Sequence, residues 1–551
     1  MDETVLAGKV GLCYIWDSMT HLTRTSLLLA FFFAADKAVA ILRQVVIARQ
    51  FGLSPELDAF NVANNVPDLL FALISGGALA IAFIPVLTEV LTRQGREATW
   101  RVFSNVANLA FLVTAGLGLV VFAAARPMVE WELGIAPGFG GEQQALVITL
   151  MRLNLVATLI FSISGLVMAG LQANQHFLLP AMAPLLYNLG QIFGALVLSP
   201  EKGYQLGGVT LPAMGLGVYG LVYGVILGAI LHLAIQIPGL IRYRFQWSFG
   251  LGLRTAEVQK VLRVMGPRLL SVFLVQLIFL VRDNLASRLA AGAVTALTYG
   301  WMIQQLPETL IGTAIGTALL PTLAEQVARK ERLQFEQTLS RAVQVLTALT
   351  VPVAVVLGLG LRPLVAAAFG FDAAGTDLLM WATRGFLLGL IGHSLLEVAA
   401  RSFYAQQDAL TPLLGAVVNV TIYIALGSQL YRPLGPAGIS LTDSVAFTVQ
   451  AVLLLVLLGR PPVGIVRWIR SRFRTKDGAA AEDLRILTPV QLGTTPWRSL
   501  AAGLVSGGVV LAVQAAAGGL SPLLVGAASM AAGGAAALPV IWREIRILLK
   551  M

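Results

Sequence analysis

Several charged and amide side chains lie inside stretches of this sequence that are otherwise strongly apolar. A charge at the centre of a bilayer costs about 2.5–3.5 kcal/mol on insertion scales, so such residues usually face a partner or a water-filled cavity. The cations among them suit an anionic headgroup, because the planar guanidinium of arginine can donate two hydrogen bonds to one phosphate. We predict a hydrated binding cavity whose lining residues are Lys37, Arg43, Asp58, Asn61, Asn65, Asp68, Arg282 and Asp283.

The spacing of these residues places them on shared helix faces. Asp36 and Arg43 are seven residues apart, which is close to two helical turns. The four polar residues from Asp58 to Asp68 follow one another at steps of three, four and three, which draws one polar stripe. In an alternative interpretation, these groups form structural salt bridges within each half of the chain or extend to the membrane interface.

Other polar residues within apolar stretches are predicted to serve the structure. Arg49 and Arg288 lie near span ends, where basic side chains anchor a helix at the membrane interface. The two histidines in apolar spans are predicted to be packed and neutral, with a proton relay as the alternative. We predict structural contacts for four charged residues, which are Arg152, Glu397, Arg401 and Asp443. The two histidines are His232 and His393.

Composition restricts the class of protein. Of the 551 residues, 57% are hydrophobic and only 12% are charged, and a soluble chain of this length needs far more charge to cover its surface. One cysteine, four scattered histidines and the absence of any metal-ligand spacing leave no basis for a disulfide framework, a metal site or a cofactor. We therefore expect a membrane protein that is not an enzyme.

Apolar windows of roughly 20 residues predict about fourteen transmembrane helices. They lie near 26–50, 58–90, 102–125, 146–171, 178–198, 212–240, 264–288, 294–325, 342–361, 376–404, 411–428, 437–458, 499–517 and 522–542. With the N-terminus inside, the five predicted cytoplasmic segments 91–101, 241–268, 326–341, 459–498 and 543–551 hold 24 Lys and Arg residues, and the outer loops hold 6. This asymmetry places both termini in the cytoplasm, and it also accounts for the net charge of +10 without nucleic acid.

Two sets of six predicted spans resemble each other, which indicates an internal repeat. Arg43 and Arg49 match Arg282 and Arg288, and the spacing between paired motifs falls smoothly along the chain. The other matching motifs are Val66-Pro67-Asp68 with Leu306-Pro307-Glu308, Pro85 to Glu89 with Pro321 to Glu325, Pro180 to Asn188 with Pro412 to Asn419, and Gly217 and Gly220 with Gly435 and Gly438. Such like-oriented halves suggest alternating access, with a substrate site between them.

The predicted fold is an all-α polytopic membrane protein with two parallel-repeat six-helix lobes around a central cavity and two C-terminal helices. The predicted parts are an N-terminal extension (1–23), an N-lobe (24–240), a C-lobe (241–460), a cytoplasmic basic loop (461–494) and the last two helices (495–551). The basic residues of this loop are predicted to reflect the positive-inside rule for cytoplasmic loops, and binding of anionic lipid headgroups is the alternative. Glycines in the last two spans and in the sixth are expected to allow close helix packing.

The chain resembles the MurJ/MviN family of lipid II flippases over roughly residues 24–460. The resemblance rests on several stretches taken together, and any one of them alone is weak evidence. They include Leu42 to Gly52, Asp58 to Leu70, Gly76 to Pro85, Ala136 to Phe139, Met265 to Pro267, Gly316 to Pro321, and Arg401 to Asp408 followed by Thr411-Pro412.

The resemblance implies export of an undecaprenyl-diphosphate-linked peptidoglycan precursor across the bacterial cytoplasmic membrane. It places Arg43 and Asp58 on essential family positions, and Lys37 replaces an arginine there with its charge retained. Phe71 and Met302 stand where the family has two further cavity arginines, which leaves another lipid-linked glycan, an amphiphilic drug or a transport-dead scaffold as alternatives. Expected partners are the lipid-linked diphosphate, membrane lipid and proteins of cell-wall synthesis or division.

Overall fold

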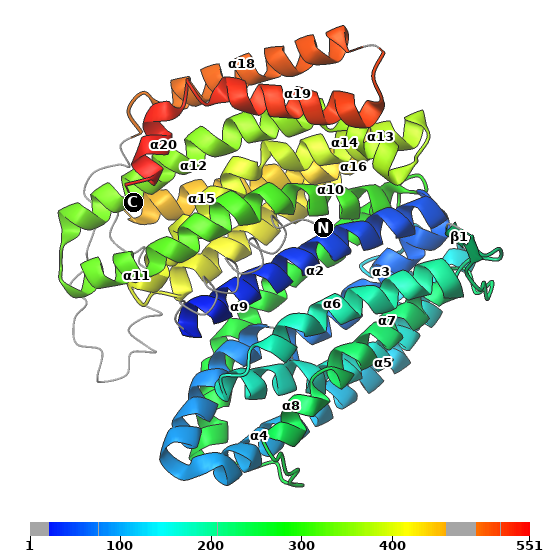
Figure 1. Cartoon of the computed structure of the whole chain (residues 1–551), viewed down its shortest axis with the longest axis vertical. Helices are drawn as coiled ribbons and strands as arrows, with labels where there is room; N and C mark the ends of the chain where they lie inside the picture. Colours follow the sequence, from blue (N-terminus) through cyan, green and yellow to red (C-terminus); the bar gives the residue numbers. More distant parts are fainter. Residues whose placement is uncertain (1–20, 75–76, 207, 459–491, 518, 551) are drawn as a thin grey trace, which may run out of the picture. The chain divides into compact units, whose positions relative to one another are not determined.

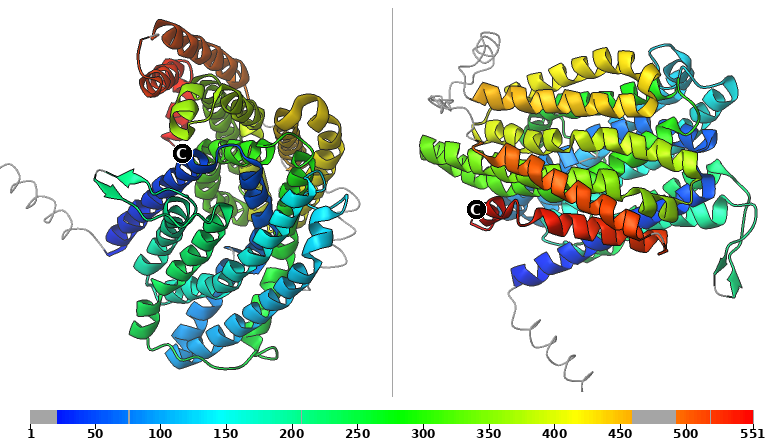
Figure 2. Two further views of the ribbon diagram at one scale, coloured as in Figure 1. Left: turned by 90° about the vertical axis from the view of Figure 1, so that its right-hand side faces the viewer. Right: turned by 90° about the horizontal axis from the view of Figure 1, so that it is seen from above.

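The computed structural model describes residues 21–74, 77–206, 208–458, 492–517 and 519–550 (Figure 1). Most of the predicted N-terminal extension and of the basic loop lies outside these ranges. The described chain is built from helices, with one short antiparallel hairpin that pairs Gln205 with Thr210 and projects beyond the helices of its unit (Figure 2). The predicted all-α polytopic class is confirmed.

The helices and strands of the first half follow one another in a simple order. They are α2 (His21–Phe51), α3 (Pro55–Ile74), α4 (Gly77–Glu130), α5 (Gly141–Ala173), α6 (Leu178–Phe193), the π-helical turn η1 (Gly194–Leu198), β1 (Gln205–Leu206), β2 (Val209–Thr210), α7 (Val218–Ala234) and α8 (Ile237–Arg242).

The described elements of the second half are all helical. They are α9 (Ala256–Ala286), α10 (Ala293–Glu308), the π-helical turn η2 (Thr309–Thr313), α11 (Ala314–Ala328), α12 (Arg332–Gly360), α13 (Arg362–Phe369), α14 (Ala373–Leu388), α15 (Leu390–Ala405), α16 (Leu410–Leu458), α18 (Thr495–Ala516), α19 (Pro522–Ala537) and α20 (Trp542–Leu548).

The chain forms two compact units. The first contains the described residues of Met1–Phe51, Ala63–Met128 and Ala145–Val272, and the second contains Gly52–Val62, Val129–Gln144 and those of Phe273–Met551. The lobe boundaries proposed at residues 240 and 460 remain predictions.

Within the described residues, ten helices are long and apolar enough to cross a membrane, or eleven if α19 and α20, bent by 84°, form one span. The predicted count of fourteen is not confirmed. Two reasons for the difference are visible in the sequence. The charged helices α2 and α3 are not among the ten, and α16 counts once although its glycine break lies between two predicted spans.

The backbone carries the same signature in both halves, which supports the internal repeat. Gly217 has φ 55° and ψ −137°, and its predicted counterpart Gly435 has φ 58° and ψ −142°, a conformation that few residues other than glycine adopt. Three more pairs with positive φ stand close to the spacing of the sequence repeat. These pairs are Gly52 with Gly292, Gly95 with Lys330, and Gln175 with Gln407.

Glycines allow α7 to pack directly on α6 and η1, as the sequence predicted. A β-carbon on Gly224 would lie 2.8 Å from the Cα atom of Gly194, and one on Gly190 would lie 2.5 Å from the Cα atom of Gly228. In the second unit, α18 and α19 pack on each other and on α12 (Figures 1 and 2). A β-carbon on Gly507, Gly526 or Gly533 would lie within 3.0 Å of a neighbouring side chain. Gly508 and Gly534 face open space, so the predicted packing role is wrong for these two glycines.

Gly224→Ala is expected to destabilise the first unit, because its β-carbon would contact the backbone of Gly194 and force α7 away from η1. Overpacking of this kind costs about 1–3 kcal/mol. Thermal unfolding of the purified protein in detergent should show a lower midpoint. Gly118→Ala in α4, where the new methyl group meets nothing within 4 Å, should leave the midpoint unchanged or slightly raised. Equal midpoints for the two variants would contradict the packing argument.

Candidate functional site

Arg43 of α2 is held in place by a short hydrogen-bonded chain inside the first unit. Its Nη1 atom donates to Oδ1 of Asn188 on α6 at 2.8 Å, and Nδ2 of Asn188 donates to Oδ1 of Asp36 at 2.8 Å. Asn188 is buried, with 4% of its surface exposed, whereas Arg43 and Asp36 are half-buried. The amide therefore links the cation and the carboxylate that share one face of α2 and fixes the direction of the guanidinium.

Three more predicted site residues, Asp68, Lys37 and Asn65, lie in the first unit. Asp68 of α3 is exposed, and it lies within electrostatic range of both Arg43 and Tyr187. Lys37, one residue after Asp36, is also exposed. Asn65 is half-buried, and its neighbour Asn64 accepts a hydrogen bond from Asn154 on α5 at 2.6 Å. Lys37 and Arg43 are thus two predicted site cations on α2 that an anionic group could approach.

Asp58 has a different environment in the second unit. It is buried, with 1% exposed, and it accepts from the backbone N–H of Gly292 at 2.6 Å and from the backbone N–H and hydroxyl of Thr295 at 2.8 and 2.6 Å. Gly292 is the left-handed residue at which α10 begins. Asp58 therefore caps the N-terminus of α10, where backbone N–H groups lack partners and a negative charge is favourable.

Asn61 joins the same contact, since its Nδ2 atom donates to the Thr295 hydroxyl at 3.0 Å. Two members of the predicted polar stripe therefore attach the start of α3 to the start of α10. The sequence showed that these positions are polar, but their partners are more than 230 residues away. This geometry favours a positioning role for Asp58 and Asn61 over direct contact with a substrate.

Arg282 and Asp283 of α9 form a buried ion pair, as the alternative interpretation of the sequence expected. The Nε atom of Arg282 donates to Oδ1 of Asp283 at 3.0 Å, and the two residues are 5% and 0% exposed. The guanidinium also lies 5.1 Å from the ring centre of Phe279, a favourable cation–π distance. Arg282 thus has partners within its own unit.

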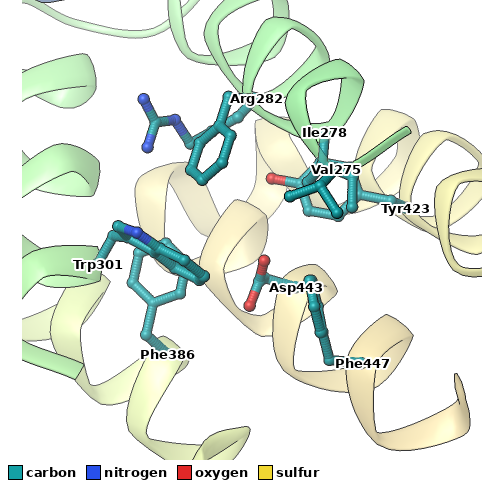
Figure 3. A pocket seen from close by; sticks show the side chains of 9 residues that line it. Val275, Ile278, Arg282, Trp301, Phe386, Tyr423, Asp443 and Phe447 are labelled. Carbon is teal, nitrogen blue, oxygen red and sulfur yellow. The ribbon is translucent and has the colours of Figure 1, made fainter. Parts of the chain in front are cut away.

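Arg282 nevertheless lines a small cavity of about 20 Å³, which is enough for one water molecule. Figure 3 shows the Asp443 carboxylate and the Tyr423 hydroxyl facing this space, with Trp301 and Phe386 across from them. The lining is mostly apolar, and the remaining members are Val275, Ile278, Phe279 and Phe447.

Sequence reasoning missed the partner of Asp443. Its Oδ2 atom lies 2.8 Å from Nε2 of His393 on α15, and both side chains are buried. The histidine ring stacks on Phe447 at 3.9 Å between ring centres. His393 and Asp443 lie 50 residues apart on different helices, so spacing gave no signal that they pair.

The other residues assigned to structure also have local partners. Arg152 donates to the Phe122 carbonyl, and Arg401 pairs with Glu397. His232 is hydrogen-bonded to the Ser164 hydroxyl at 2.6 Å in a buried site. Arg288 pairs with Glu132 at 2.6 Å, an exposed contact that ties the end of α9 to the loop before α5. Within the described residues, no three His, Cys, Asp or Glu side chains are placed to hold a metal ion.

Long apolar helices with charges held inside them by specific partners are the features of a multi-pass membrane transporter. Residues 47–475 match the family described as "Lipid II flippase MurJ", so the chain belongs to that family. A "Lipid II flippase MurJ" from Burkholderia cenocepacia is 32% identical over 464 residues, which cover 82% of this chain and 86% of the relative. A "Probable lipid II flippase MurJ" from Rhizobium tropici is 27% identical over 78% of this chain and 79% of its own.

Solved structures agree on the fold. A structure titled "Lipid II flippase MurJ, inward closed conformation" matches with a TM-score of 0.70, at 19% identity over 95% of this chain and 100% of that one. An inward-facing multidrug resistance MATE family transporter of the MOP superfamily matches with a TM-score of 0.62, at 18% identity over 76% of this chain and 93% of that one. Family membership and the ten long apolar helices among the described residues make the chain a multi-pass protein of the bacterial cytoplasmic membrane.

Asp58→Ala is expected to destabilise the second unit, because it leaves two backbone N–H groups and the Thr295 hydroxyl at the start of α10 without their acceptor. Loss of a helix cap and burial of unsatisfied donors cost about 1–3 kcal/mol. Thermal unfolding in detergent should show a lower midpoint. Glu56→Ala, an exposed neighbour on the first turn of α3, is the matched control and should unfold as the wild type does. A stable Asp58→Ala protein would contradict the capping role.

Proposed function

We propose that this chain moves lipid II, the undecaprenyl-diphosphate-linked peptidoglycan precursor, from the inner to the outer leaflet by alternating access. Membership of the lipid II flippase family carries the proposal. Its substrate is a lipid-linked diphosphate in the membrane, and the activity is transport.

The cations of α2 are the proposed contacts for the diphosphate. Arg43 is oriented by Asn188 through one Nη atom, and guanidinium groups bind phosphate oxygens with several donors at once. Lys37 is exposed on the same helix and adds a second positive charge. Asp36 and Asn188 act as positioning residues, because they hold Arg43 in a fixed direction before the headgroup arrives.

The remaining predicted site residues have supporting parts in this proposal. Asp68 is a polar neighbour of Arg43, and Asp58 and Asn61 attach α3 to the start of α10. Arg282 and Asp283 belong to the buried cluster around the small cavity. We place both termini in the cytoplasm on the basis of the Lys and Arg distribution, and we expect proteins of cell-wall synthesis or division to be partners.

One observation favours a second substrate. Phe71, at a position where the family resemblance expected an arginine, packs its ring on Phe161 with 5.2 Å between ring centres. Phe161 in turn contacts Tyr187 and His232. This aromatic cluster provides no cation for a diphosphate at position 71. Export of another polyprenyl-linked glycan, or of an amphiphilic compound, is the alternative that this cluster supports.

Arg43→Ala is expected to abolish rescue of a bacterial strain depleted of its own lipid II flippase, because the variant loses a fixed cation for the diphosphate. Wild-type chain should restore growth and cell shape, and Lys37→Ala should weaken the rescue. Arg101→Ala is the matched control, since Arg101 is exposed and pairs only with Glu97 in the same helix among the contacts described. Membrane levels of each variant should be measured by immunoblot.

The same strain separates the alternatives. Failure of wild-type chain to rescue growth, with normal membrane levels, would contradict the lipid II proposal. Deletion in the native host that spares peptidoglycan but removes another surface glycan would support the second substrate. Full rescue by a chain that lacks both Lys37 and Arg43 side-chain charges would point to a scaffold without transport.

A further inference from the structure

Three aromatic rings lie beside the proposed diphosphate contact in the first unit. Phe71 of α3, Phe161 of α5 and Tyr187 of α6 follow one another at 5.2 and 5.1 Å between neighbouring ring centres. We call these three rings the aromatic row. All three side chains are half-buried, so each keeps part of its surface open. Tyr187 directly precedes Asn188, the acceptor of Arg43, and it lies within electrostatic range of Arg43 itself. The aromatic row therefore begins next to this cation.

Asp68 adds a carboxylate to the same place. It is exposed, and it stands three residues before Phe71, so the two side chains share a face of α3. It lies within electrostatic range of both Arg43 and Tyr187. A carboxylate at this range repels a diphosphate that is bound to Arg43, and so weakens the binding of a diphosphate alone. A ligand that carries hydrogen-bond donors next to its phosphates offsets this repulsion.

We infer that the aromatic row and Asp68 bind the first sugar ring of the lipid-linked substrate, which is the ring bonded directly to the diphosphate. We call this arrangement the sugar subsite. The inference rests on the proposed function, and it names the part of the substrate that the site selects. A pyranose ring has a face of C–H groups, which suits the negative face of an aromatic ring. Its hydroxyl groups donate charge-assisted hydrogen bonds to a carboxylate.

An organic cation is the other kind of ligand that aromatic rings and a carboxylate suit. Arg43 argues against it, because this cation lies within electrostatic range of both Asp68 and Tyr187 and repels a second positive charge. A sugar diphosphate satisfies the cation, the carboxylate and the rings together. Phe71 stands where the family resemblance expects an arginine, so this chain replaces a contact to the diphosphate with a contact to the sugar.

The binding test compares two short-chain lipids on the purified full-length protein in detergent. Farnesyl diphosphate carries the diphosphate alone, and farnesyl-diphosphate-linked N-acetylglucosamine adds one uncharged sugar. In isothermal titration calorimetry, wild-type protein should bind the sugar-bearing lipid about tenfold more tightly, which corresponds to about 1.4 kcal/mol. Arg43→Ala should weaken the binding of both lipids, because both carry the diphosphate.

Substitutions of Phe71 test the aromatic contact. Phe71→Leu keeps an apolar side chain but removes the aromatic face, so the ratio of the two dissociation constants should fall toward one. Phe71→Tyr retains the ring and should keep the ratio. Phe111→Leu is the matched control, because Phe111 is an exposed aromatic residue of α4 in the same unit, and its two dissociation constants should equal those of the wild type.

Asp68→Asn should change the binding of the diphosphate and of the sugar in opposite directions. Loss of the negative charge beside Arg43 should tighten the binding of farnesyl diphosphate. Loss of the carboxylate acceptor should lower the ratio of the two dissociation constants, since the sugar hydroxyl groups no longer have a charged acceptor. A purely structural role for Asp68 predicts weaker binding of both lipids, and that result would overturn its place in the sugar subsite.

The outcomes separate this inference from the proposed function. A wild-type ratio near one, with binding of both lipids that depends on Arg43, would overturn the sugar subsite and leave the proposed function in place. A wild-type preference for the sugar-bearing lipid, together with failure to rescue the flippase-depleted strain, would overturn the lipid II proposal and support a sugar subsite for another polyprenyl-linked glycan. Binding of the cation tetraphenylphosphonium that depends on Asp68, without a preference for the sugar-bearing lipid, would overturn the sugar subsite.

Discussion

A charged side chain inside a membrane span must find its partner within the protein, and this constraint organises both units of the chain. Lipid tails offer no hydrogen bonds, so every carboxylate, guanidinium and amide in a span needs a donor, an acceptor or trapped water. The observed solutions differ from site to site. Asp58 accepts three hydrogen bonds from residues at the start of α10. Arg43 donates to the side-chain amide of Asn188, which in turn donates to Asp36, and Arg282 forms an ion pair with the adjacent Asp283. These contacts also fix how the helices within each unit pack.

The two halves of the internal repeat share a backbone plan but use their polar groups differently. Arg43 and Arg282 occupy matching positions, as do Asn188 and Asn419. In the first unit Asn188 accepts a hydrogen bond from Arg43. In the second unit Asn419 donates to Gln450, and Arg282 forms an ion pair with Asp283. The first unit therefore offers a partly exposed cation, and the second encloses a neutralised one beside a small cavity.

Positioning residues account for much of the polar stripe on α3. Its first two members, Asp58 and Asn61, are hydrogen-bonded to Thr295. Asp68, at the other end of the stripe, is exposed and lies within electrostatic range of Arg43. One periodic pattern thus contains two kinds of residue, because a helix that passes between different environments has different neighbours along its length. The contacts of Asp58 therefore serve the placement of α10 against α3.

The sequence by itself determined the helical membrane class, the internal repeat, the family and the positions at which charges interrupt apolar spans. These features are encoded locally, since hydropathy, glycine positions and motif order are read along the chain. Only the tertiary structure decided which partner each charge has. Asp58 and Thr295, Arg43 and Asn188, and His393 and Asp443 are far apart in sequence, and a hydrogen bond depends on the rotation and depth at which two helices pack. Spacing within one helix carries no information about that rotation.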